Sequence, residues 1–335
     1  MKAKYRPNVV FCLVVLLAVV ACSAASPTST PVKVFKVGIL GFTGSQASDF
    51  AALRAGLADQ GFVEGQNITY VYQIPASPDK VADSANALVA QNVDLVYGWG
   101  RVEGLALKAT KTMVPVVFGA SYMPVEFGLV PALDHPGGNV TGAVITNSAA
   151  RRLQLLTQMD SNVHNVLLPF KPDDPLAAAM VVSIKDVAPN LNVNLVIANM
   201  TDSASAADVM TNAPSNIDAL FLLPDRLTLA NYRPWLSQAS IRNIPVSTFV
   251  GLFVTNDYLM AYGPDNTSQS MQSAHVISQI LKGSNPGDLP VEPVDQYLAI
   301  NLDIAQRLNI TVPDSILQQA KVIVRPGSAT PAATK

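Results

Sequence analysis

Residues 114–146 read VPVVFGASYMPVEFGLVPALDHPGGNVTGAVIT, and this stretch decides how the chain is organised. The apolar run Val114–Phe118 predicts a buried strand, which an irregular loop (Gly119–Pro124), a short helix and a Pro-Gly-Gly-Asn turn follow. A second apolar run, Val140–Ile145, predicts another strand. Because strand and helix patterns alternate before this stretch and start again after it, we expect one α/β unit to end here and another to begin. Parallel sheets bind ligands beyond the carboxyl ends of their strands, so the Gly119–Pro124 loop is a candidate binding loop.

Outside this stretch, short apolar runs continue to alternate with amphipathic helix patterns. The predicted strands are Val37–Leu40, Ile68–Tyr72, Val93–Tyr97, Val163–Leu168, Val193–Ala198, Ala219–Leu223, Pro245–Phe249 and Tyr258–Tyr262. The predicted helices are Ala47–Gln60, Pro78–Gln91, Arg101–Thr112, Asp173–Val187, Ser203–Thr211, Leu227–Ala239 and Ser268–Leu281. Continuous apolar strands between such helices indicate parallel sheets that are covered on both faces. The predicted fold class is therefore α/β, with two doubly wound parallel-sheet lobes joined by a hinge.

The first 21 residues have the pattern of an export signal. Three basic residues precede an apolar run of about 13 residues, and the segment ends with Val-Val-Ala-Cys at 19–22. This run is short for a membrane span, which needs roughly 20 apolar residues. Its ending resembles a bacterial lipobox, which implies cleavage before Cys22 and acylation of that thiol; an ordinary signal peptide with an incidental cysteine is the alternative. We expect an extracytoplasmic protein that lipid at Cys22 anchors to the bacterial cell membrane.

Composition excludes several classes of function. Without residues 1–21 the chain carries 19 basic and 24 acidic residues, a net charge of −5, so nucleic acid is not an expected partner. Cys12 lies in the signal and Cys22 would carry lipid, which excludes a disulfide, a thiolate metal site and a cysteine nucleophile. The three histidines lack metal-ligand spacing, and no nucleophile-elbow motif occurs. We predict no metal, no cofactor and no enzymatic activity.

Four segments share the spacing of one protein family. They are Pro115–Phe118 continuing to Pro136–Gly142, Asp218–Leu220 with Pro224-Asp225, Ala261–Asp265 with Ile280–Gly283, and Ile300–Leu302 continuing to Ala320. Together they resemble the ABC transporter substrate-binding protein family related to the tryptophan-binding lipoproteins, which has the periplasmic-binding-protein-like type I fold. The resemblance spans Lys36 to about Val324 and implies solute capture for an ABC importer, with ligands that include amino acids.

The resemblance also sets the expected domain boundaries. They are 1–21 signal peptide, 22–33 flexible tether, 34–143 with 264–291 lobe 1, 144–263 with 292–326 lobe 2, and 327–335 disordered tail. The expected partners are a small-molecule ligand, an ABC permease with its cytoplasmic ATPase, and the membrane, with the protein itself a monomer. A sensor lipoprotein that signals to a membrane receptor is the alternative, and an extracytoplasmic enzyme on the same fold is a third reading.

Three loops in lobe 1 and the first crossing supply candidate ligand groups. The loop Thr43, Gly44, Ser45 and Gln46 opens a predicted helix, whose N–H groups attract an anion such as a carboxylate; Ser45 as a helix cap only is the alternative. Trp99 can stack on a flat ligand and Arg101 can pair with a carboxylate, or they can be a hinge-side filler and a solvated cation. The remaining candidates of this lobe and the first crossing are Ser121, Tyr122, Met123 and Thr146.

Lobe 2 supplies Lys171, Asp225 and Phe249, which lie at or shortly after the ends of predicted strands. Asp225 matches an acidic position of the family, and capping of the helix near Leu227 is its alternative role. Met123 stands where the family has Asp before Pro-Val, which weakens the case for recognition of an α-amino group. Together with apolar Val250 and Leu252, this substitution predicts a ligand that is less polar or differently charged than a simple amino acid.

Overall fold

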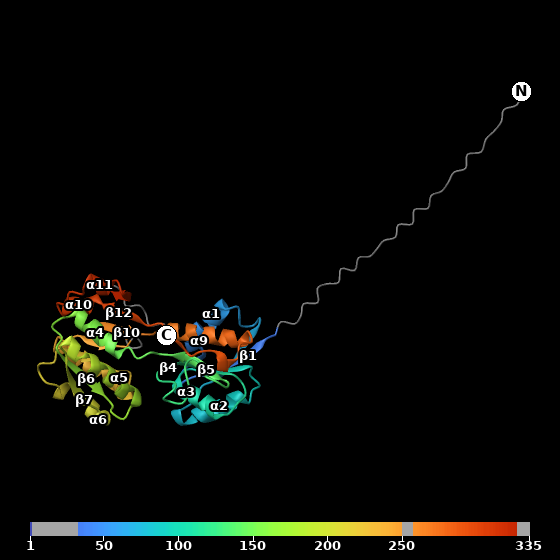
Figure 1. Cartoon of the computed structure of the whole chain (residues 1–335), viewed down its shortest axis with the longest axis horizontal. Helices are drawn as coiled ribbons and strands as arrows, with labels where there is room; N and C mark the ends of the chain where they lie inside the picture. The colour runs from blue at the N-terminus through green and yellow to red at the C-terminus, as the bar shows by residue number, and fades with distance from the viewer. Residues whose placement is uncertain (2–32, 250–256, 327–335) are drawn as a thin grey trace. The chain divides into compact units, whose positions relative to one another are not determined.

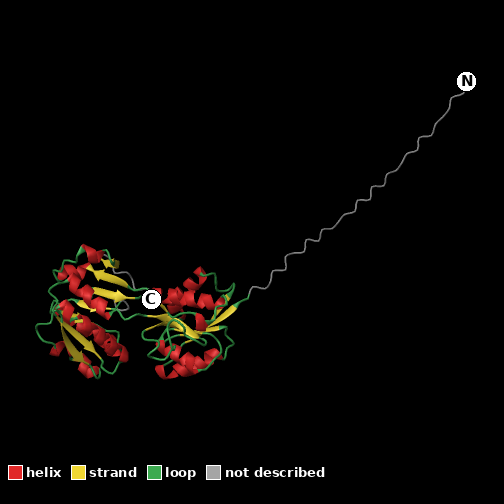
Figure 2. Ribbon diagram, in the orientation of Figure 1, coloured by secondary structure: helices red, strands yellow, loops and turns green. Residues whose placement is uncertain are grey.

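The computed structural model describes residues 1, 33–249 and 257–326 of the chain (Figure 1). From Val34 onward the chain forms one compact unit, which contains two β-sheets with helices packed along them (Figure 2). The predicted signal peptide, tether, Cys22 acylation and C-terminal tail lie outside the described residues, as do Val250 and Leu252. These predictions therefore stay predictions.

The first sheet contains six strands and is parallel throughout. Its strands are β1 (Phe35–Leu40), β2 (Ile68–Gln73), β3 (Leu95–Gly98), β4 (Val116–Ser121), β5 (Val140–Val144) and β11 (Glu292–Pro293). Their spatial order is β11-β5-β4-β3-β1-β2. Every residue of β3 and β5 is buried, as expected for parallel strands that are covered on both faces.

The helices of this half follow its strands. They are η1 (Ala47–Phe50), α1 (Ala51–Asp59), η2 (Pro78–Lys80), α2 (Val81–Val89) and α3 (Arg101–Ala109). Helix α9 (Asn266–Leu281) and the short η5 (Pro286–Asp288) come from much later in the sequence. Helix α9 packs against α1, and Ala274 and Ile277 join the same apolar cluster as Val37 and Leu53. The C-terminal part of the chain is thus needed to complete the core of the first half.

The second sheet contains seven strands. They are β6 (Asn165–Phe170), β7 (Asn194–Asn199), β8 (Ala219–Phe221), β9 (Val246–Thr248), β10 (Met260–Gly263), β12 (Tyr297–Asn301) and β13 (Ala320–Val324). Their order is β13-β12-β10-β9-β8-β6-β7, and β10–β12 is its one antiparallel pair. The helices are α4 (Ala149–Met159), α5 (Pro175–Val187), η3 (Pro189–Leu191), α6 (Ser203–Ala207), α7 (Val209–Asn212), α8 (Arg226–Ile241), α10 (Leu302–Arg307) and α11 (Asp314–Leu317).

The chain passes between the two sheets three times. It leaves the first sheet after β5 and enters α4, returns after β10 into α9, and crosses again from β11 into β12. Each passage leaves from the carboxyl end of a parallel strand. Strand β12 enters the second sheet at that same edge, which is why it runs antiparallel to β10. The exact lobe boundaries stay a prediction.

Two local predictions have clear outcomes. The short helix expected after Pro124 is wrong, because residues 124–128 form turns in which Leu129 N–H donates to the Pro124 carbonyl. The left-handed backbone of Met123 (φ 50°) and Gly128 (φ 74°) brackets this segment and prevents a helix from propagating. The helix predicted over Asp173–Val187 is observed as α5 (Pro175–Val187), and the Asp174 carboxylate caps it by accepting hydrogen bonds from Leu176 N–H and Ala177 N–H.

Candidate ligand-binding site

The order of the strands locates the candidate site. In the first sheet the winding reverses between β1 and β3, and in the second sheet it reverses between β6 and β8. Loops that leave a sheet at such a reversal diverge to opposite faces, which opens a crevice at the carboxyl edge. The predicted ligand residues lie at or after the carboxyl ends of strands β1, β3, β4, β5, β6, β8 and β9, and those after β1, β3, β6 and β8 flank the two reversals.

An aromatic group occupies this edge of the first sheet. The Trp99 ring lies 5.5 Å from the rings of both Phe42 and Phe50, tilted by 50° to the first and edge-on at 85° to the second. Phe50 contacts Tyr72 in turn, with ring centroids 5.8 Å apart. Phe50 is fully buried, whereas Phe42 and Trp99 are only half-buried. The contacts with Phe42 and Phe50 therefore hold the Trp99 ring in place, and part of the ring stays accessible for stacking.

The backbone behind Trp99 is packed too closely for side chains. A Cβ added to Gly119 would come within 1.9 Å of the Trp99 carbonyl oxygen. A Cβ on Gly142 would lie 2.2 Å from the Phe118 carbonyl oxygen. These two glycines therefore allow β3, β4 and β5 to approach each other and fix the position from which Trp99 projects.

The loop after β1 differs from the prediction in its helix start. A 3-10 turn occupies Ala47–Phe50, and the α-helix begins only at Ala51, with Phe50 at its N-cap and no side-chain cap. Ser45 as a cap is therefore wrong. Its hydroxyl oxygen is buried, with the residue 6% exposed, and has no hydrogen-bond partner among the described residues. Thr43 and Gly44 are exposed, so their role toward a ligand stays a prediction.

Arg101 and Glu103 are both engaged within the first half. The Arg101 guanidinium lies 3.8 Å from the centroid of the Phe127 ring, and its pairing with a ligand carboxylate stays a prediction. The Glu103 carboxylate accepts a hydrogen bond from Gly100 N–H at 3.2 Å, and burial raises the pKa of this carboxyl. Together these contacts hold the loop that carries Trp99.

The loop after β4 reaches into the second half. The Ser121 hydroxyl is buried and donates to the Tyr122 carbonyl at 3.0 Å. The Tyr122 ring packs against the apolar cluster of the second sheet, and burial raises the pKa of its phenol to about 12. Met123 follows in a left-handed conformation with φ 50°. A non-glycine residue in this region costs roughly 1–2 kcal/mol, so the loop is held by its surroundings.

Asp225 is the most buried acidic residue at the edge of the second sheet. It is 1% exposed, and its two carboxylate oxygens accept from Thr228 N–H at 2.9 Å and from the Thr228 hydroxyl at 2.8 Å. Burial raises the pKa of Asp225, and the nearby Asp174 carboxylate adds to this rise, while the Thr228 hydrogen bonds oppose it. The capping role considered for Asp225 is therefore confirmed, and a ligand role stays a prediction.

Lys171 follows β6 and Phe249 follows β9, the strands on either side of β8 in the second sheet. Lys171 forms an ion pair with Asp173, directly after β6, so its ammonium is already paired. Phe249 is partly buried and ends the described segment after β9. Their ligand roles also stay predictions.

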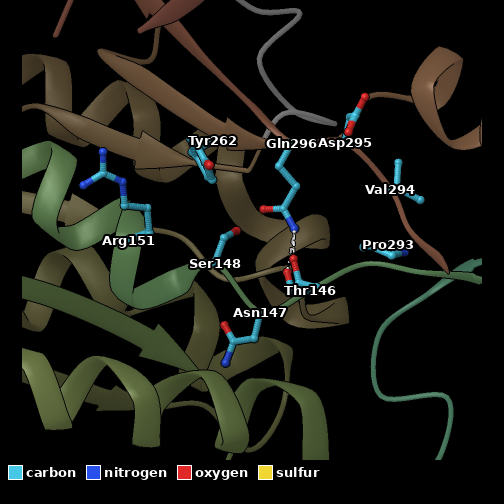
Figure 3. Close-up of a pocket in the computed structure, with 9 residues that line it drawn as sticks. All are labelled: Thr146, Asn147, Ser148, Arg151, Tyr262, Pro293, Val294, Asp295 and Gln296. Atoms are coloured by element: carbon cyan, nitrogen blue, oxygen red, sulfur yellow. Dashed lines mark hydrogen bonds between the residues drawn. The ribbon is translucent and has the colours of Figure 1, made fainter. Parts of the chain in front are cut away.

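Thr146 lies in a pocket between the crossing segments (Figure 3). The pocket has a volume of about 360 Å³. Its lining residues are Thr146, Asn147, Ser148, Arg151, Tyr262, Pro293, Val294, Asp295 and Gln296. The Gln296 amide donates to the Thr146 carbonyl at 2.8 Å and to its hydroxyl at 2.6 Å, so it joins two crossings. Thr146 thus belongs to the hinge contacts in this structure.

Sequence reasoning missed three residues. Phe42 was treated as part of a loop, although its ring contacts Trp99. Gln296 gave no signal, because its partner lies 150 residues earlier. Arg152 is buried in the second half, with 3% of its surface exposed. In the sequence, two adjacent arginines near the start of a helix suggest side chains in contact with solvent. An arginine at a position that the helical period assigns to the apolar face was the available signal.

Within residues 33–249 and 257–326 no cluster of three or more metal-ligating side chains occurs. The same part of the chain contains no helix that is both long and apolar enough to span a membrane.

Comparison with known proteins adds the family. Residues 36–324 match the model of the family described as ABC transporter substrate binding protein. A tyrosine-binding protein of Clostridioides difficile (strain R20291) is 25% identical over 257 residues, which are 76% of this chain and 74% of that protein. The structure of an ABC domain in complex with L-Trp from Streptococcus pneumoniae superposes with a TM-score of 0.74 at 26% identity, over 87% of this chain and 100% of the other.

A ligand-free, open substrate-binding protein with adhesive properties from Clostridium difficile has the same fold, with a TM-score of 0.72 at 22% identity over 87% of this chain and 99% of the other. The predicted fold class of two parallel-rich α/β lobes is confirmed. The predicted family resemblance is confirmed as well. The chain belongs to the ABC transporter substrate-binding protein family, whose members bind solutes and are not enzymes.

Proposed function

We propose that this protein is the extracytoplasmic solute-binding lipoprotein of an ABC importer, and that it captures an aromatic amino acid or a less polar analogue between its two lobes. The observation that carries the proposal is the position of the crossings. All three leave from the carboxyl edges of the sheets, where the ligand loops of both sheets also lie. A solute that contacts both edges would favour the closed arrangement of the lobes.

The two edges offer different chemistry to one solute. The first offers the half-buried rings of Phe42 and Trp99, which suit a flat apolar group. The second offers the buried carboxylate of Asp225, which suits an ammonium group. Relatives whose printed ligands are L-Trp and tyrosine support this assignment. Met123 in place of the acidic residue of the family leaves Asp225 as the proposed ammonium partner.

In this proposal the crossing segments act as the hinge about which the lobes close. The Gln296 amide joins the crossing after β11 to Thr146 in the crossing after β5. Rotation of one lobe against the other changes the backbone of both segments, so this contact limits the range of opening. The closed form would then dock on the permease and release the solute there.

The membrane anchor is a separate part of the proposal. It rests on the Val-Val-Ala-Cys sequence at 19–22, which supports cleavage and acylation at Cys22. Mass spectrometry of the protein from membranes should find an acylated N-terminal Cys22, and Cys22→Ser should release the protein from the membrane fraction. Full retention of the Cys22→Ser variant would contradict the anchor without affecting the binding assignment.

Isothermal titration of the unit from Val34 onward tests the ligand class. L-tryptophan and L-tyrosine are expected to bind with one-to-one stoichiometry, and a polyol of similar size is not. A thermal-shift screen gives the same answer independently, because a ligand at 100 times its dissociation constant adds about 2.7 kcal/mol to the free energy of unfolding. Absence of binding by every aromatic amino acid, together with binding of the polyol, would overturn the proposal.

A further inference from the structure

Arg152 is a buried cation that no described carboxylate neutralises. It lies on α4, which follows directly after the first crossing, and only 3% of its surface is exposed. One guanidinium nitrogen donates to the Leu222 carbonyl at 2.5 Å, and the guanidinium carbon lies 4.0 Å from the centroid of the Phe221 ring. The Nε atom is buried and has no hydrogen-bond partner among the described residues.

The charge of this group persists in the interior. Burial lowers the pKa of the Arg152 guanidinium to about 9, so the group is still protonated at neutral pH. An uncompensated buried cation is unfavourable, and proteins retain one only where a partner neutralises it. The segments outside the described residues, 2–32, 250–256 and 327–335, contain no Asp or Glu. The missing side-chain partner is therefore not hidden in those segments.

The surroundings of Arg152 place it at the carboxyl edge of the second sheet. Leu222 immediately follows β8 and precedes Pro224-Asp225, the loop at the reversal of the strand order. Tyr122, from the first half, packs against the cluster of the second sheet, and it opposes the effect of burial on the pKa of Arg152. Arg152 thus contacts the two residues that come shortly before the loop with Asp225.

We propose that Arg152 neutralises a carboxylate of the bound solute, and that it selects carboxylates over ligands without one. The Arg152 Nε atom and charge then obtain the partner that none of the described side chains provides. This inference rests on the proposed function and deepens it. Asp225 and Arg152 would take the two charged groups of an amino acid, while Trp99 and Phe42 take its ring.

The experiment uses three probes that share the indole ring. L-tryptophan carries both charged groups, indole-3-propionate carries only the carboxylate, and tryptamine carries only the ammonium. Each is titrated calorimetrically into the wild type, Arg152→Met, Arg152→Lys and the control Arg242→Met. Arg242 also donates to backbone carbonyls, those of Met210, Ala213 and Pro214, but lies away from the carboxyl-edge loops.

Arg152→Met should weaken the binding of L-tryptophan and of indole-3-propionate at least about tenfold, and it should change the affinity for tryptamine by less than about twofold. Arg152→Lys should keep part of the preference for carboxylates, and Arg242→Met should keep all of it. The ligand-free Arg152→Met protein should melt at the same or a higher temperature, because the substitution removes an unpaired buried charge.

The inference is overturned if Arg152→Met still prefers the carboxylate probes over tryptamine, or if its affinity for all three probes falls equally. It is also overturned if the variant melts at a far lower temperature and its preference among the probes is unchanged. It is also overturned if neither carboxylate probe binds the wild type. Binding of indole-3-propionate without L-tryptophan would uphold the role of Arg152 and refute the amino acid as the ligand, so the two failures are distinguishable.

Discussion

The carboxyl edges of the two sheets differ in the kind of side chain that they bury. The edge of the first sheet buries rings and backbone: Phe50 lies under Trp99, and Gly119 lies against the Trp99 carbonyl. The edge of the second sheet buries charge: Asp225 and Arg152 are 1% and 3% exposed. The first sheet thus has an apolar carboxyl edge, which we call the apolar wall, and the second has a charged one, which we call the charged wall.

In the proposed function, this difference would let one solute hold both lobes. Apolar contact depends on area and is tolerant of orientation, whereas a buried charge is neutralised only by a partner in the right place. A solute with a ring at one end and charged groups at the other satisfies both walls only when the lobes close. The predictions below test each wall separately.

The largest expected effect is on the apolar wall. Gly119→Ala should lower the free energy of unfolding by about 3 kcal/mol, because the new methyl group collides with the Trp99 carbonyl. Chemical denaturation measures this loss. Gly61→Ala is the control: Gly61 has φ 92° with open space around its Cβ, so only the strain of about 1 kcal/mol is expected. Equal losses at the two positions would contradict the close packing behind Trp99.

Trp99→Ala should weaken binding of L-tryptophan by about 2 kcal/mol, roughly thirtyfold, because it removes the half-buried ring of the apolar wall. Calorimetric titration gives the affinity. Val102→Ala removes an exposed apolar side chain three residues away and should change the affinity by less than about twofold. An unchanged affinity in Trp99→Ala would remove this ring from the site.

Asp225→Asn should weaken binding of L-tryptophan by about 1.5 kcal/mol and leave indole-3-propionate unaffected, since only the ammonium loses its partner. Asparagine also caps helices, so the fold should be retained. Asp173→Asn, which removes an exposed carboxylate of the same lobe, is the control. A loss that is the same for both probes would show that Asp225 serves only the helix cap.

The raised pKa of Asp225 gives a dependence on pH with a defined sign. Because burial raises the pKa in the folded state above the unfolded value of about 3.9, the folded protein binds more protons between the two values. This residue therefore makes the free energy of unfolding fall as pH rises through that window, and Asp225→Asn should remove its contribution. The affinity for L-tryptophan should show the opposite trend and decline on acidification through the raised pKa. If the affinity of Asp225→Asn declined on acidification as much as that of the wild type, the titrating group would be another residue.

The smallest expected effect is at the hinge. Gln296→Ala removes two hydrogen bonds to Thr146, each worth about 1 kcal/mol at most. Small-angle scattering of the ligand-free variant should show a wider distribution of opening, with an affinity change below about fivefold. Asn199→Ala, an exposed amide at the end of β7, is the control. If the variant scattered as the wild type does, the contact between Gln296 and Thr146 would not limit the opening of the lobes.

The sequence predicted those features that follow from local periodicity and turn chemistry. Apolar strands and Asp174-Pro175 at a helix start identified the elements, and strand ends identified the loops. The departures came from contacts between distant residues. Gln296 meets Thr146 across 150 positions, and Gly119 is required by the Trp99 carbonyl.

The same limit applies to the candidate site. Arg101 contacts the Phe127 ring, a contact that no local pattern predicts, and the turns after Pro124 replace a helix because Met123 adopts a left-handed backbone. Arginine is usually a surface residue, but Arg152 is buried like a core residue. Only its contacts with Phe221 and Leu222 in the folded protein show that it is buried.

A crystal structure of the protein grown with L-tryptophan tests the central claim most directly. The account predicts one molecule between the lobes, with its indole ring against Trp99 and Phe42 and its charged end at the loop that carries Asp225. An indole ring buried in the second half, or a ligand that contacts one lobe alone, would contradict it.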